Sequence, residues 1–261
     1  MKYIVKKALT LVGTLLLVSF IAFLLFQIVP GDPVTSMLGT EYSEERAESL
    51  REELGINKPV IVRYVNWLTD FVKGDFGISY KYKMPVSRLI SDKMPVTMYL
   101  AVITLIVIVI ISIPLGVFMA RFGHRKVSKI FDIVNQSVMA VPSFFLGIMI
   151  TIIFGLVLKW FTPGKYVSYR DDFNGFIMYL IPAAFAVAIP KIAMMVKFLK
   201  NSLIREMDSD YVRTAYSKGA GENRVLFCHV LRNGLMPAIT LLGMIIAEIM
   251  AGSIVVEQVF N

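Results

Sequence analysis

Ionisable residues inside long apolar runs are the first places in this sequence where chemistry could occur. Glu248 stands near the middle of such a run, where inserting an acidic side chain into a bilayer costs about 2.5–3.5 kcal/mol. Residues of this kind usually face a cavity or a partner helix. Glu248 therefore either lines a path across the membrane or makes a structural hydrogen bond. Pro142 and Ser143, in an earlier apolar run, either line such a path or only kink a helix.

A polar segment of residues 208–237, between two long apolar runs, is the second candidate. Residues 208–210 are favourable N-cap residues, and Gly219 stands where the following helix would end in a left-handed residue. We expect Pro237 to start the next membrane segment. Residues 222–231 form a second helical run, whose apolar side is expected to hold Val225, Leu226, His229 and Val230. A short helix, a glycine hinge and an amphipathic helix predict a docking element rather than an active site.

Motifs that would give the chain an enzymatic activity of its own are missing from the sequence. No Gly-x-x-x-x-Gly-Lys-Ser/Thr loop is present to hold phosphates, so we expect no ATP binding or hydrolysis by this chain. The His-Glu-x-x-His and Gly-x-Ser-x-Gly patterns are absent as well. Cys228 is the single cysteine, which excludes an internal disulfide and a cysteine metal cluster. His124 has no second ligand beside it, so we expect no metal site.

The composition predicts an all-α polytopic membrane protein. Hydrophobic residues make up 56% of the chain and charged residues 18%, and the mean hydropathy is +0.68. Several apolar runs exceed the roughly 20 residues that cross a bilayer. The net charge of +8 comes from basic residues that flank these runs, which the positive-inside effect explains better than nucleic-acid binding. We expect five spans, at residues 8–29, 96–120, 130–158, 176–199 and 238–256.

Residues 1–94 are expected to form a first membrane helix followed by a segment outside the membrane. Three lysines precede the first apolar run, and they predict a retained helix whose N-terminus is cytoplasmic. Surface helices are expected at residues 44–54 and 60–72. In the second of these, Trp67 and Phe71 could dock a partner or pack on the membrane or on the protein itself.

The motifs of the polar segment resemble the cytoplasmic coupling loop of ABC importer permeases from the oligopeptide/dipeptide/nickel branch. The family pattern is Glu-Ala-Ala, three residues, Gly and a closing apolar-Pro pair. Here Arg213-Thr214-Ala215 takes the Glu-Ala-Ala place, so the first glutamate is missing. The similar motifs elsewhere are Pro30-Gly31-Asp32-Pro33, Gly74-Asp75-Phe76-Gly77-Ile78-Ser79, residues 140–147 and residues 256–260.

This resemblance implies a type I ABC importer permease fold, with residues 95–261 as the permease domain. It implies that separate ATPase subunits, which carry ATP and Mg²⁺, dock on the coupling loop. It further implies a second homologous permease subunit, an extracytoplasmic solute-binding protein, a location in a bacterial-type inner membrane and a sixth span beyond Asn261. The residues expected to carry the docking are Asp210, Tyr211, Arg213, Thr214, Ala215, Gly219, Arg232, Asn233 and Pro237.

Three other interpretations remain beside this resemblance. A secondary transporter could use Glu248, although such proteins have inverted repeats and several buried charges, and neither is visible here. An intramembrane enzyme would need a catalytic pair that the sequence lacks. The polar segment could also be an ordinary basic connecting loop. Within the family, peptides, nickel complexes and glutathione are all possible solutes.

Overall fold

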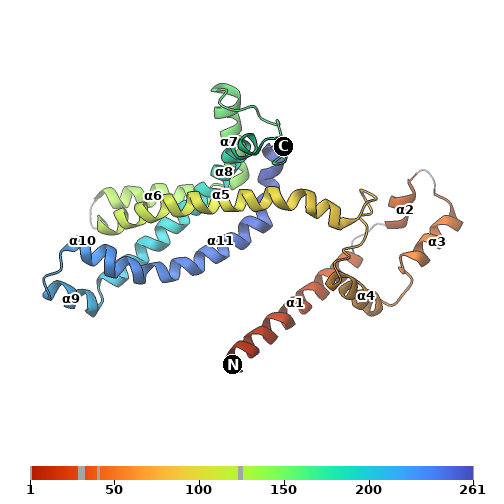
Figure 1. The fold of residues 1–261 in the computed structure, drawn as a ribbon, viewed down its shortest axis with the longest axis horizontal. Helices are drawn as coiled ribbons and strands as arrows, with labels where there is room; N and C mark the ends of the chain where they lie inside the picture. Colours follow the sequence, from red (N-terminus) through yellow and green to blue (C-terminus); the bar gives the residue numbers. More distant parts are fainter. Residues whose placement is uncertain (1, 29–32, 40–41, 123–125, 261) are drawn as a thin grey trace. The chain divides into compact units, whose positions relative to one another are not determined.

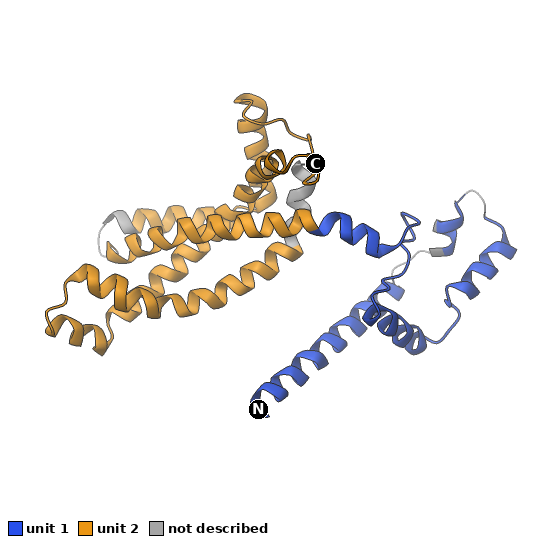
Figure 2. Ribbon diagram, in the orientation of Figure 1, with its two compact units in different colours: residues 1–94 blue, residues 95–261 orange. Residues whose placement is uncertain are grey.

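A computed structural model describes residues 2–28, 33–39, 42–122 and 126–260 of the protein. The chain divides into two compact units, residues 1–94 and residues 95–261 (Figure 2). Among these described residues, four helices are long and apolar enough to cross a membrane, and a bent helix pair would make a fifth span if it is counted as one. Within the described residues the helices are accompanied by a single isolated bridge, between Ile78 and Pro85. These features confirm the all-α polytopic class.

The first unit holds the helices α1 (Lys2–Ile28), α2 (Pro33–Leu38), α3 (Glu44–Glu53) and α4 (Val60–Val72) (Figure 1). The Ser43 hydroxyl caps α3 by accepting a hydrogen bond from the Arg46 backbone N–H at 3.3 Å. Gly55 follows α3 with a positive φ of 65°. Both expected surface helices are therefore confirmed. The resemblance motif at residues 30–33 lies largely outside the described residues.

Aromatic side chains join α4 to α1. The Tyr64 hydroxyl lies 2.8 Å from the Ser19 hydroxyl and donates to the Leu16 carbonyl at 3.1 Å. The Trp67 ring lies 6.0 Å from the Phe23 ring and 5.5 Å from the Phe71 ring, measured between centroids. Of the roles open to Trp67, packing on the protein itself is the one observed.

The second unit is a helical bundle built around α8 (Phe173–Met207) (Figure 1). It contains most of α5 (Val86–Arg121), then α6 (Lys126–Ala140), α7 (Ser143–Ile150), the π-helix η2 (Thr151–Val157), α9 (Asp210–Ser217), α10 (Glu222–Arg224), the π-helix η3 (Val225–Val230) and α11 (Leu231–Phe260). The α8 helix packs against α6, α7 and α11. Figure 1 shows α9 and α10 at the end of the bundle where α5 ends and α6 begins, opposite α7.

Small residues let neighbouring helices approach α8 closely. A Cβ atom added at Gly116 of α5 would lie 2.8 Å from Leu199, and one added at Gly234 of α11 would lie 2.6 Å from Leu203. The Ser202 hydroxyl also donates to the Gly234 carbonyl at 2.9 Å. Small interface residues and interhelical hydrogen bonds are how membrane helices associate, since burial from water cannot drive helices together within lipid.

The expected third span, residues 130–158, is not one straight helix. It is broken between Ala140 and Ser143, where the two parts meet at 93°. Val141 precedes a proline, which disfavours the helical conformation, and Pro142 is extended with φ −64° and ψ 140°. Pro142 thus ends one helix and caps the next, which is a stronger effect than the kink considered from the sequence.

The expected start of the last span at Pro237 is wrong. Pro237 lies inside α11, and the run from Glu222 to Ala251 is one long helical stretch. Proline removes one backbone donor, but membrane helices tolerate it where neighbouring helices and side chains satisfy the freed backbone groups.

Candidate functional site

The loop between α8 and α11, residues 208–230, is the polar site at one end of the bundle and is called the α9 loop below. Its helix α9 has two faces. Val212 is buried at 2% exposure, and Tyr211 and Ala215 pack against the core of the unit. Asp210, Arg213 and Thr214 are exposed on the other side. One face of the helix is therefore held by the core of the unit, and the opposite face is polar and exposed.

Glu206, near the end of α8, fixes the start of α9 through bonds from two hydroxyl groups. Ser209 is the N-cap residue, but its hydroxyl donates to the Glu206 carbonyl instead of accepting from α9. The Tyr211 hydroxyl donates to the Glu206 carboxylate at 2.7 Å. Asp210, in the first turn, places a negative charge at the positive end of the helix dipole.

Gly219 ends α9 in the left-handed conformation expected from the sequence, with φ of 81°. Its N–H donates to the Tyr216 carbonyl at 2.9 Å, and the next N–H, of Ala220, donates to the Ala215 carbonyl at 3.1 Å. This pair of bonds is the Schellman motif, which satisfies carbonyls that the helix end would leave unpaired. No atom outside its chain neighbours lies within 4 Å of an added Cβ, so backbone conformation alone favours glycine here.

The rest of the expected docking set lies elsewhere. Arg232, Asn233 and Pro237 belong to α11, beyond the loop that carries α9. Of the expected apolar face of residues 222–231, the three aliphatic side chains are buried, but His229 is exposed. This stretch includes η3, whose π-helical turns hold more residues than an α-helical turn, and that shift moves His229 off the face.

Arg121, the last residue of α5, contacts this loop. Its Nε atom lies 3.1 Å from a carboxylate oxygen of Glu222, and its Nη1 atom donates to the Asn223 side-chain carbonyl at 3.1 Å. In the sequence, Arg121 is only one of the basic residues that flank the apolar runs. The residues around Arg121 in the sequence give no indication of its contact with residues about a hundred positions away.

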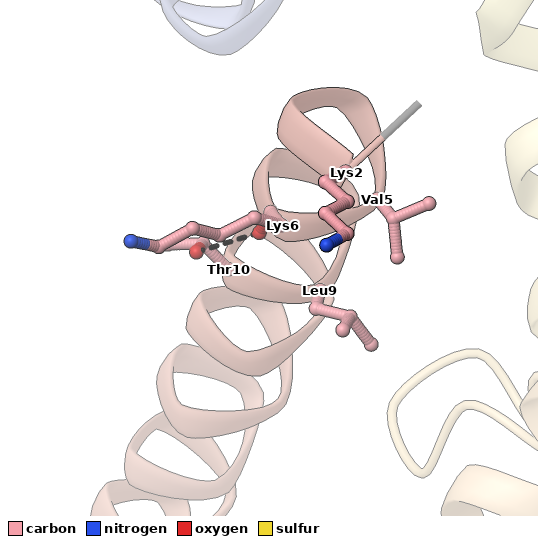
Figure 3. Close-up of a pocket in the computed structure, with 5 residues that line it drawn as sticks. All are labelled: Lys2, Val5, Lys6, Leu9 and Thr10. Carbon is pink, nitrogen blue, oxygen red and sulfur yellow. Dashed lines mark hydrogen bonds between the residues drawn. The ribbon is translucent and has the colours of Figure 1, made fainter.

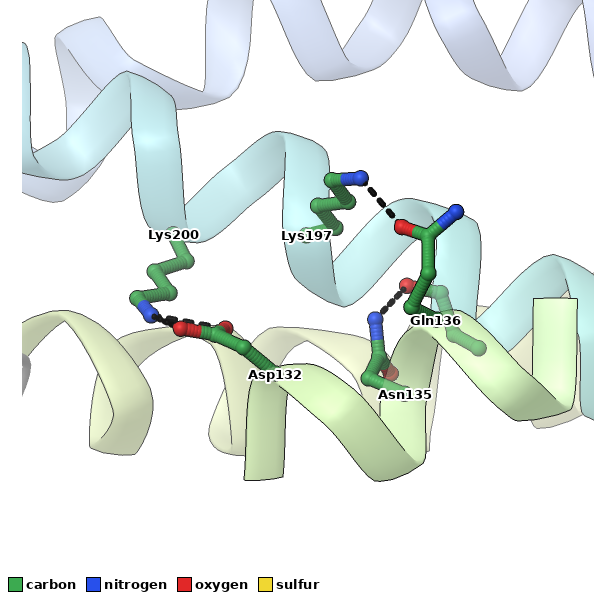
Figure 4. A network of polar contacts seen from close by, with 6 residues as sticks. Asp132, Asn135, Gln136, Lys197 and Lys200 are labelled. Carbon is green, nitrogen blue, oxygen red and sulfur yellow. Dashed lines mark hydrogen bonds and ion pairs between the residues drawn. The ribbon is translucent and has the colours of Figure 1, made fainter. Parts of the chain in front are cut away.

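Charged side chains of α8 meet partners on neighbouring helices within the bundle. Lys200, whose side chain is 9% exposed, reaches both Asp132 oxygens at 2.8 and 2.7 Å, and Lys197 donates to the Gln136 side chain (Figure 4). The buried Asn135 amide donates to the Ala193 carbonyl at 2.7 Å. These three contacts join α6 to α8.

Glu248 of α11 forms an ion pair with Lys191 of α8. The Lys191 side chain is 14% exposed, whereas that of Glu248 is 60% exposed. The pair gives Glu248 the structural contact that the sequence left open, while much of its carboxylate surface stays uncovered by this chain. Pro142 is exposed and Ser143 is half-buried at the break between α6 and α7. Across the described ranges, no group of three His, Cys, Asp or Glu side chains could hold a metal ion.

Comparison with known families decides what kind of protein carries this loop. The family described as the binding-protein-dependent transport system inner membrane component matches residues 112–261. The chain belongs to this family. A second family model, for the N-terminal part of such membrane components, matches residues 1–101. The chain is thus a permease component of an ABC importer, a translocation subunit that works with ATPase subunits and a solute-binding protein. The secondary-transporter interpretation has no support.

Known relatives are similar over nearly the whole chain. The oligopeptide transport system permease protein AppB of Bacillus subtilis is 36% identical over 262 residues, which cover 99% of this chain and 83% of AppB. A putative peptide transport system permease protein of Brucella suis is 34% identical, covering 98% of this chain and 82% of that protein. The glutathione transport system permease protein GsiC of Escherichia coli is 31% identical, covering 100% and 83%.

Neutralising one member of the Lys191–Glu248 pair should destabilise the bundle more than neutralising both. Lys191→Met alone leaves the Glu248 carboxylate without its partner in an apolar segment. Glu248→Gln alone leaves the Lys191 ammonium without its partner in the same way. Because Glu248 is largely exposed, we expect each single change to cost only about 1–2 kcal/mol, with at least half recovered in the double variant. Thermal unfolding in lipid nanodiscs measures this.

The matched control is Lys197→Met, which removes a lysine from the same helix whose partner is the neutral Gln136. It should have a smaller effect than Lys191→Met. Strictly additive losses in the double variant would show that the two charges do not stabilise the bundle as a pair.

Proposed function

We propose that this chain is the permease subunit of an importer for peptides or related small solutes that bear an amide backbone. The support is the group of similar proteins, whose names refer to oligopeptide, peptide and glutathione transport. In the complete importer a second homologous permease would pair with this chain, and two ATPase subunits would supply ATP and Mg²⁺. No nucleotide is expected on this chain itself.

The α9 loop is proposed as the surface on which an ATPase subunit docks. The observation that carries this proposal is the arrangement of α9, which is anchored by Val212 and Ala215, closed by Gly219 and polar on its exposed face. We assign the contact to Asp210, Arg213 and Thr214. Movement of the ATPase subunits would displace α9 and, through α8 and α11, drive alternating access. ATP drives such a change only if the two conformations differ in their interaction with the ATPase subunits.

We also propose that the uncovered side of Glu248 lines the translocation path, together with Pro142 and Ser143. A largely exposed carboxylate at mid-membrane depth is more stable against water or a partner chain than against lipid. Uptake by Glu248→Gln and by the Lys191→Met/Glu248→Gln pair separates this role from the structural one. A path-lining carboxylate predicts that uptake stays impaired in the double variant even where thermal stability returns.

The orientation proposed for the chain places its N-terminus and the α9 loop in the cytoplasm. A shallow hollow of about 450 Å³ beside the first turns of α1 is lined partly by Lys2 and Lys6 (Figure 3). Lysines at a helix end are typical of the cytoplasmic side. In a Cys228→Ser background, a membrane-impermeant thiol reagent applied to intact cells should label Ser43→Cys and leave Lys218→Cys unlabelled. The opposite labelling pattern would reverse the topology.

Gly219→Val tests the coupling role directly. The left-handed conformation costs a residue with a Cβ roughly 1 kcal/mol, and a β-branched residue more, which tilts α9 without unfolding the spans. We expect normal insertion and pairing with the second permease, but loss of ATPase attachment or of solute-stimulated ATP turnover. Gly219→Ala should show a milder loss.

The control is Gly221→Val, two residues further along the same loop. Gly221 has a negative φ of −70°, and no atom lies within 4 Å of an added Cβ. The Gly221→Val variant should therefore keep most of the solute-stimulated ATP turnover. Reconstitution with the ATPase subunits and binding protein gives both readouts. Wild-type coupling in Gly219→Val would mean that the loop is a passive linker.

A further inference from the structure

Arg121 can transmit the movement of the α9 loop to α5, a helix to which the loop is not directly joined in the chain. The loop is covalently attached to α8 and α11. Arg121 ends α5, which precedes the loop by about ninety residues in the chain. Its guanidinium contacts two successive loop residues, Glu222 and Asn223, each at 3.1 Å. A planar guanidinium fixes direction as well as distance when two of its nitrogens are engaged.

The electrostatics of the two helix ends favour this contact. Arg121 places a positive charge at the C-terminal, negative end of the α5 dipole. Glu222 places a negative charge in the first turn of the helix that begins there. Each charge is therefore favourable where it stands, and their pairing brings two opposite helix ends together.

Apolar side chains next to the contact are buried in the core of the unit. Val225, Leu226 and Val230 are buried directly after Glu222. A small cavity of about 70 Å³ is lined by these three side chains together with Arg121, Met207 and Tyr216. Arg121 therefore borders the same small space as the buried apolar side chains of the loop.

We propose that Arg121 is a positioning residue that makes the cytoplasmic end of α5 move together with the α9 loop. The proposal rests on the docking role assigned to that loop. With the contact in place, a displacement of the loop shifts α5 as well as α8 and α11. Because the Arg121 and Glu222 side chains are 38% and 59% exposed, losing the pair should change the population of the docked loop by no more than about fivefold. The loop should loosen rather than unfold.

A distance measurement between α5 and the loop tests this in the complete importer in nanodiscs. Spin labels are placed at Ile110→Cys and Lys218→Cys, two exposed positions, in a Cys228→Ser background. With Arg121 present, the label–label distance should stay unchanged between the nucleotide-free and ATP-bound states. In Arg121→Gln it should broaden and differ between the two states, and solute-stimulated ATP turnover should fall about two- to fivefold.

Arg224→Gln is the matched control, because it removes one positive charge from the same loop. The Arg224 side chain is exposed and makes no hydrogen bond or ion pair within the described part of the chain. It should keep the constant distance and the turnover of the unmodified protein. The charge-swapped pair Arg121→Glu/Glu222→Arg should keep the label–label distance more constant than Arg121→Gln does, because it restores an ion pair, but less constant than the unmodified protein, because both charges then oppose the helix dipoles.

Two results would overturn the proposal. One is an Arg121→Gln protein with the same distances in both states as Arg224→Gln. The other is a charge swap that behaves no better than Arg121→Gln alone. A failure of the docking role is distinguishable, because Gly219→Val would then couple normally while the distance measurement still reports on the Arg121 contact.

Discussion

The rest of the structure depends on ion pairs between lysine side chains of α8 and acidic side chains of the neighbouring helices. A hydrocarbon layer offers no hydrogen-bond partners, so lysines in a membrane helix must find them on other helices or reach the surface. Lys200 finds Asp132 on α6, and Lys191 finds Glu248 on α11. These contacts, with the close approaches at Gly116 and Gly234, set how α5, α6 and α11 lie against α8. Because α8 and α11 also carry the two ends of the α9 loop, the same constraint decides where that loop stands.

Two scales of interaction meet in the loop. Its own conformation is local, since the Schellman bonds at Gly219 and Ala220 involve only residues 215–220. Its position is not local, because it depends on Val212 in the core and on Arg121 at the end of α5. A rigid local shape on an anchored base is suited to passing on a displacement, since neither the helix nor its attachment has to reorganise first. The missing first glutamate of the family pattern leaves this geometry intact, with Arg213 exposed in its place.

Local sequence signals predicted the local features. The apolar runs indicated the membrane helices, a helix was expected at residues 44–54 close to the observed α3, and Gly219 was expected in the left-handed conformation that it adopts. Pairings across the bundle could not be predicted, because nothing near Lys200 in the chain indicates Asp132, and nothing near Arg121 indicates Glu222. The two errors of extent have a common cause. The helix is broken at Pro142, where the chain turns by 93°, whereas α11 continues through Pro237. Tertiary packing decides between these two outcomes.

Photo-crosslinking tests most directly whether the exposed face of α9 is the ATPase-docking surface. A photoreactive amino acid is introduced at Thr214 or, as control, at Lys129, which is exposed on α6 outside the loop. Both sites lie on the proposed cytoplasmic side of the complete importer. The account predicts an efficient crosslink from Thr214 to an ATPase subunit and little or none from Lys129. Equal yields at the two positions, or no ATPase adduct at Thr214, would contradict it.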